Sequence, residues 1–111
     1  MYKYETIIIM KPNITEEEKQ KELDNYKELF ESYSNKEVSV EDIGKKILAY
    51  EVKGNKEGNF AIFNYSANFE DVAEAEKKIR DDEKIIKFIS VRHEQELEQE
   101  NEDIEDDEME V

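Results

Sequence analysis

The chain has 111 residues, 42% of them charged, and its 31 acidic and 16 basic residues give a formal net charge of −15. It has no cysteine and one histidine, which excludes a disulfide scaffold, a thiolate metal site, a cysteine nucleophile and a site built from several histidines. No apolar run approaches the roughly 18 to 20 residues that span a membrane, and the first residues lack the apolar core of a signal peptide, so we expect a soluble, cytosolic protein of one domain.

Residues 2–10 predict the first strand, because they are rich in aromatic and β-branched side chains. The unbroken apolar run at 7–10 is typical of a central strand that is covered on part of both faces. Pro12 and Asn13 then predict a turn.

Thr15 and Glu18 have the spacing of a capping box and predict the start of a helix. The apolar residues that follow recur every three or four positions over about five turns, and they are Leu23, Tyr26, Phe30 and Tyr33. We interpret this stripe as the buried face of a helix rather than as a binding face.

An alternating pattern of apolar and polar residues starts at Val38, resumes after Gly44 and continues to Val52. We therefore expect one long strand with a bulge or bend at Gly44. Residues 53–59 predict a hairpin loop, and residues 60–67 predict the returning strand.

Asn68 is the expected N-cap of a second, shorter helix, and the acidic residues 81–83 are expected to end it. The narrow apolar stripe of this helix consists of Val72, Ala75 and Ile79. Residues 85–91, rich in isoleucine, phenylalanine and valine, predict a last strand.

This order of elements predicts an α+β, ferredoxin-like split β-α-β sandwich over residues 1–93. Its four-stranded antiparallel sheet would be covered by both helices on one face. The other face would be left to solvent or to a partner, which makes the fold a common binding platform without deciding its function.

Residues 94–111 hold eleven acidic side chains and no basic one, so we expect an acidic, disordered C-terminal tail. Without this segment, 16 basic and 20 acidic residues remain, and the folded part is only mildly acidic. We interpret the tail as a solvated extension; the functional alternative is a lure for a basic partner or a brake on non-specific RNA binding.

Catalytic chemistry is poorly represented, so we expect no enzyme activity, no cofactor and no metal site. His93, the only side chain with an unperturbed pKa near neutrality, lies beside the acidic tail. The sequence has no phosphate-binding, dinucleotide-binding or nucleophile-elbow motif. An acyl-phosphate hydrolase is disfavoured because the loop after the first strand has no arginine.

A binding role fits the sequence better, because cations and tyrosines occur together along the expected strands. They are Lys45, Lys46, Lys53, Lys56, Arg92, Tyr2, Tyr4 and Tyr50. On RNA, cations contact phosphates and aromatic rings stack on exposed bases. The alternative is that the lysines protect a sheet edge from aggregation while the tyrosines pack the sheet, and the pattern alone leaves both readings open.

Several segments of the chain agree with one known family. The most specific is the block Gly-Lys-Lys-Ile-Leu-Ala-Tyr from Gly44 to Tyr50. Pro12-Asn13 after the first strand and the segment 81–92 agree in order and spacing. Taken together, these segments resemble ribosomal protein six of the bacterial small subunit, and the resemblance covers residues 1–93.

The resemblance implies a non-catalytic structural constituent of the small subunit on the cytoplasmic ribosome. Members of that family bind the central domain of small-subunit rRNA together with the basic small-subunit ribosomal protein eighteen. Carried over by position, the residues expected near RNA are Lys3, Tyr4, Lys45, Lys46, Tyr50, Lys53 and Arg92. The chain departs from the family where lysines replace arginines at 45–46, which loses the bidentate fork, and where Glu51 replaces proline.

A basic partner would also explain how an acidic chain joins an RNA complex, because it would supply much of the phosphate neutralisation. The strand before the hairpin is the expected edge for docking that partner by strand addition. The alternative function is a ferredoxin-like protein-interaction or regulatory domain that does not bind RNA.

Overall fold

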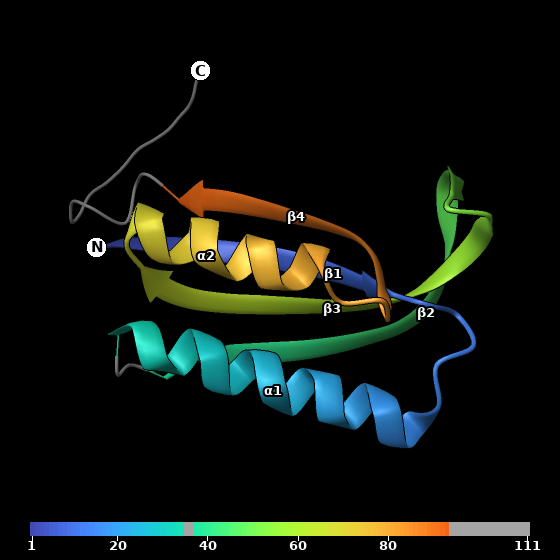
Figure 1. The fold of residues 1–111 in the computed structure, drawn as a ribbon, viewed down its shortest axis with the longest axis horizontal. Helices are drawn as coiled ribbons and strands as arrows, with labels where there is room; N and C mark the ends of the chain where they lie inside the picture. The colour runs from blue at the N-terminus through green and yellow to red at the C-terminus, as the bar shows by residue number, and fades with distance from the viewer. Residues whose placement is uncertain (35–36, 94–111) are drawn as a thin grey trace.

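The computed structural model of the chain describes residues 1–34 and 37–93. In chain order its elements are β1 (Tyr2–Met10), α1 (Glu16–Ser34), β2 (Ser39–Val52), β3 (Asn55–Ala67), α2 (Phe69–Arg80) and β4 (Ile85–His93). The strands form one antiparallel sheet in the order β2-β3-β1-β4. Both helices lie on the same face of this sheet (Figure 1), which confirms the predicted ferredoxin-like sandwich. The segment 94–111, predicted as an acidic tail, lies outside the described residues.

The two helices begin where side chains satisfy the first backbone amides. The Glu18 amide donates to Thr15 Oγ1 at 3.1 Å, and the Thr15 amide donates to Glu18 Oε1 at 3.2 Å, which confirms the predicted capping box. At α2 the Asn68 amide donates to Asp71 Oδ2 at 3.2 Å. These local contacts let both helices start at the predicted positions.

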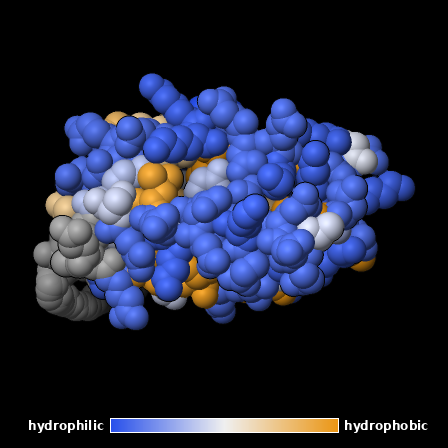
Figure 2. Space-filling view, turned by 60° about the horizontal axis from the view of Figure 1, so that its bottom comes forward, coloured by the Kyte–Doolittle hydropathy of each residue, from blue (hydrophilic) through white to orange (hydrophobic). Residues whose placement is uncertain are grey.

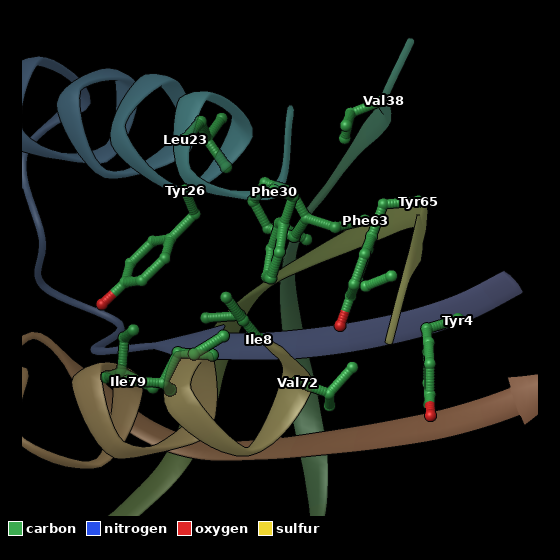
Figure 3. Packing of buried hydrophobic residues seen from close by; sticks show 14 of the residues in the cluster. Tyr4, Ile8, Leu23, Tyr26, Phe30, Val38, Phe63, Tyr65, Val72 and Ile79 are labelled. Carbon is green, nitrogen blue, oxygen red and sulfur yellow. The ribbon is translucent and has the colours of Figure 1, made fainter. Parts of the chain in front are cut away.

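The core lies between the helices and the covered face of the sheet, and aromatic rings from distant segments fill its centre (Figure 3). Phe30 of α1 is fully buried, and its ring stacks on Tyr65 of β3 at 4.0 Å between centroids. The centroid of the Phe63 ring lies 5.4 Å from the centroid of the Phe30 ring. Val72 and Ile79 close the core from α2, so both predicted helix stripes are buried faces.

The β2–β3 hairpin is longer than the sequence predicted, and it projects beyond the end of the sheet (Figure 1). β2 is one strand with a register shift between Asp42 and Gly44, where φ is +95°, as expected of a bulge. The predicted loop over 53–59 is wrong, because the turn consists of Lys53 and Gly54 alone. Both have positive φ, +49° and +80°, a combination that permits a two-residue turn matching the twist of the strands. β3 therefore begins at Asn55.

Among the described residues, no helix is long and apolar enough to cross a bilayer.

Candidate nucleic-acid and partner interface

The face of the sheet opposite the helices carries a central apolar row. Ile7 of β1 lies opposite Ile62 of β3 on one side and opposite Ile89 of β4 on the other. Directly paired residues of antiparallel strands share a face, whereas Thr6, one position earlier, is buried under the helices. Ile89 is 44% exposed and Val91, also on this face, is 45% exposed. We call this surface the open face.

The part of the hairpin beyond Gly44 carries four of the residues expected near RNA, namely Lys45, Lys46, Tyr50 and Lys53. Lys46 pairs with Gly58, which places it on the open face, while Lys45 pairs with Asn59 and belongs to the opposite face. All four side chains are exposed.

Tyr50 meets a cation from the opposite edge of the sheet. Its ring is 63% exposed. Lys87 Nζ of β4 lies 4.7 Å from the ring centroid and donates a hydrogen bond to the phenol oxygen. The projecting hairpin therefore brings an edge strand, β2, toward the start of the other edge strand, β4.

The remaining expected contacts, Lys3, Tyr4 and Arg92, lie at the other end of the sheet. Lys3 pairs with His93, and Tyr4 pairs with Arg92. The Arg92 guanidinium lies 4.6 Å from the centroid of the Tyr2 ring. Tyr4 is only 5% exposed, so its ring packs into the core and its role at this end is to hold β1 in place.

The seven expected residues thus form two groups rather than one. Lys45 is level with Met10, because both pair with Asn59, whereas the other group is level with Tyr4. Six residues of extended chain separate these levels, which corresponds to about 20 Å. One phosphate cannot contact both groups, so a ligand that uses both must be extended.

The charge of β2 changes sign at its bulge. Glu41 and Asp42 precede Gly44, and Lys45 and Lys46 follow it. Asp42 also forms an ion pair with Lys19 of α1, in which Lys19 Nζ lies 3.1 Å from Asp42 Oδ2. Burial would lower the pKa of Lys19, but its hydrogen bond and charge attraction to Asp42 raise it above the usual value.

Sequence reasoning missed Lys87, which joins Lys45, Lys46, Tyr50 and Lys53 in what we call the hairpin-end group. It lies 37 positions from Tyr50 along the chain, and a single lysine in a predicted strand carries no signal of such a contact. The pairing depends on the curvature of the hairpin, which only the assembled sheet defines.

The surface in Figure 2, where the α1 side of the molecule has come forward, is mostly hydrophilic and shows apolar groups only in small separate patches. A large apolar docking surface is therefore not found on this side. Within residues 1–34 and 37–93, no group of histidine, aspartate and glutamate side chains has the arrangement of a metal site.

A four-stranded antiparallel sheet with two helices on one face, and with Lys46 and an apolar row on the other, defines the class of ferredoxin-like α+β proteins. Comparison with known proteins gives the particular family. The family model described as "Ribosomal protein S6" matches residues 3–92. The chain therefore belongs to the ribosomal protein S6 family, and so to the proteins of the small subunit of the cytoplasmic ribosome.

Individual relatives agree with this assignment. "Small ribosomal subunit protein bS6" of Gloeobacter violaceus is 39% identical over 92 residues, which cover 83% of this chain and 96% of the relative. The protein of the same name from Sulfurovum sp. is 34% identical over 90 residues, covering 81% and 71%. The crystal structure of 30S ribosomal protein S6 from Thermotoga maritima superposes with a TM-score of 0.76 at 27% identity, covering 83% of this chain and 87% of that one.

Proposed function

We propose that the chain is a non-catalytic constituent of the small ribosomal subunit that binds the central domain of the rRNA together with the basic ribosomal protein eighteen. The proposed RNA contacts are Lys3, Lys45, Lys46, Tyr50, Lys53 and Arg92. Tyr4, the seventh residue expected near RNA, is buried and would support this end of the sheet from the core instead of touching RNA. One observation carries the RNA part of this proposal, namely that a cation lies against a tyrosine ring at each end of the sheet, Lys87 on Tyr50 and Arg92 on Tyr2. Such pairs suit phosphates and unstacked bases.

The partner part of the proposal rests on the open face and on the β2 edge. The row of Ile7, Ile62 and Ile89 offers apolar area that no helix of the described chain covers. Beside it, the first half of β2 exposes Glu41 and Asp42 at the edge of the sheet. Apolar area next to an acidic strand edge fits a basic protein that buries an apolar element and adds main-chain hydrogen bonds.

Net charge gives this arrangement a thermodynamic consequence. Residues 1–93 carry 20 acidic and 16 basic side chains, so the chain alone neutralises few phosphates. Binding to rRNA should then be weak for the chain alone and tighter once the basic partner covers acidic surface and adds its own cations.

A binding titration tests this proposal. A fragment of the rRNA central domain is titrated with the chain, with protein eighteen and with an equimolar mixture. We expect the mixture to bind at least tenfold more tightly than either protein alone. Equal affinity of the chain in the presence and absence of protein eighteen would contradict joint binding, and absence of RNA binding in all three titrations would contradict the RNA function.

The partner surface has its own matched pair of variants. Ile89→Asp places a charge in the apolar row, whereas Ala73→Asp places the same charge on an exposed position of α2. We expect the affinity for protein eighteen, measured by calorimetric titration, to fall at least tenfold for Ile89→Asp and to stay within twofold of wild type for Ala73→Asp. Equal affinities of the two variants would remove the open face as the docking surface.

A further inference from the structure

A small hollow lies where three segments meet at the start of β4, next to the hairpin-end group. Its volume is about 220 Å³, and it is bounded by the hairpin turn, the last turn of α2 and the first residues of β4. Three of its lining side chains are cations, Lys53, Arg80 and Lys87, and none is acidic. The rest of the lining is apolar and consists of three isoleucines and Phe88.

Aromatic rings and backbone geometry hold these cations in place. The Arg80 guanidinium lies 5.4 Å from the centroid of the Phe88 ring, and Lys87 Nζ lies over Tyr50. Lys53 occupies the first position of the tight turn, and Asn55 Nδ2 donates to its carbonyl oxygen at 3.1 Å. Within the part of the chain that the structure describes, no ion pair to a carboxylate engages Lys53, Arg80 or Lys87.

Three cations that line one hollow with no carboxylate in the lining repel one another. The chain as a whole has a net charge of −15, so the charge around this hollow is opposite in sign to that of the whole chain. An anion placed among the three side chains would relieve the repulsion, and Arg80 can offer it a bidentate fork.

We propose that this hollow binds a phosphate group of single-stranded RNA, with Arg80 and Lys87 as phosphate contacts outside the set expected from the sequence. The inference rests on the proposed function and extends it, because Lys53 lines the hollow and Lys87 contacts Tyr50, so the hollow continues the hairpin-end group. RNA is favoured over a free anion because the ring beside the hollow, that of Tyr50, is 63% exposed and offers a stacking surface for a base.

The test measures how RNA affinity depends on salt. The full chain and protein eighteen are titrated onto the rRNA fragment at several salt concentrations, with Arg80→Gln and Lys53→Gln as test variants. Lys77→Gln is the matched control, because Lys77 is an exposed cation in the same last turn of α2 and does not line the hollow. We expect each test variant to weaken binding about three- to tenfold and to reduce the salt slope by about one unit, with Lys77→Gln unchanged.

The outcomes separate this inference from the proposed function. If wild type binds RNA and all three variants bind like it, the hollow is not an RNA site and the proposed function stands. If wild type does not bind RNA, the proposed function and the RNA assignment of the hollow both fail. In a second experiment, inorganic phosphate is titrated into the chain and the NMR signal of the Arg80 side chain is followed. If this signal shifts while the variants leave RNA binding unchanged, the hollow binds a free anion and the proposal is overturned.

Discussion

The Tyr26 hydroxyl on α1 donates a 2.8 Å hydrogen bond to the carboxylate of Asp82, 56 positions later in the turn between α2 and β4. Asp82 also accepts from the backbone amide of Lys84 at 3.0 Å. The contact fastens α1 to the turn from which β4 starts. It lies on the helix side of the molecule, away from the open face, so it contributes to the fold rather than to the proposed interface.

Glu22, one turn before Tyr26, is 7% exposed and faces the same carboxylate. Burial, followed by the hydrogen bond to Asp82 and its negative charge, raises the pKa of Glu22 to about 7. Burial alone would raise the pKa of Asp82 as well, but hydrogen bonds from Glu22, Lys84 and Tyr26 keep it below its usual value. Folding therefore takes up a proton at Glu22 near neutral pH.

We predict that Glu22→Gln removes a pH dependence from the free energy of unfolding. The folded pKa of Glu22 is above its ordinary 4.5, so the stability that protonated Glu22 contributes is fully present below pH 4.5 and is lost as the pH rises through about 7. Gln keeps a neutral side chain at every pH. Relative to wild type, the variant should gain about 2 kcal/mol between pH 5 and pH 8, measured by urea unfolding.

Glu28→Gln is the control for this prediction, because Glu28 is an exposed carboxylate on the same helix. Its unfolding free energy should follow the wild-type pH profile. Parallel profiles for wild type and Glu22→Gln would show that Glu22 is not protonated in the folded state.

A second prediction concerns the buried hydroxyls under the helices. Thr6 Oγ1, on a residue 1% exposed, lies 2.7 Å from the Tyr65 hydroxyl and 2.9 Å from Ser90 Oγ. Thr6→Val keeps the shape and leaves both partners without this bond, which should cost about 1 to 3 kcal/mol. In thermal unfolding, the double variant Thr6→Val with Tyr65→Phe should cost less than the sum of the single changes. Additive costs would show that the two hydroxyls are not coupled.

A third prediction concerns Gly58 of β3, which lies one position beyond the residues that pair with β1 and has no room for a side chain. A Cβ atom at this position would overlap Cγ2 of Ile9 and would lie 3.3 Å from the carbonyl oxygen of Met10. Gly58→Ala should therefore destabilise the fold by about 1 to 3 kcal/mol. The cost should shrink when Ile9→Ala provides the space, and a cost that is the same in both backgrounds would contradict the steric cause.

A fourth prediction separates two neighbouring lysines. Lys46 pairs with Gly58 and lies on the open face, whereas Lys45 pairs with Asn59 and belongs to the other face. We expect Lys46→Ala to lower the salt slope of rRNA binding by about one unit and Lys45→Ala to lower it less. Filter-binding titrations over a salt series with protein eighteen present measure both slopes, and equal changes would mean that the RNA wraps both faces of the hairpin.

Much of the fold follows from short-range patterns along the chain. The capping box at Thr15, the stripe from Leu23 to Tyr33 and the bulge at Gly44 depend on residues within a few positions of one another, and the structure contains all three. The sequence pattern predicts too long a hairpin turn, because polar residues such as those at 55–59 are typical of loops. In the structure they extend β3, since a two-residue turn sets the register.

The site is different, because its parts come together only across the sheet. Lys87 reaches Tyr50, and Arg80 joins Lys53 around one hollow, through strand order and the curvature of the hairpin. The division of the seven expected residues into two groups about 20 Å apart follows from the same pairing. Local spacing therefore specified the elements and their order, and the resemblance of short sequence blocks pointed to the family. The face on which each cation lies depends on register, twist and packing between segments far apart in sequence, which local spacing does not encode.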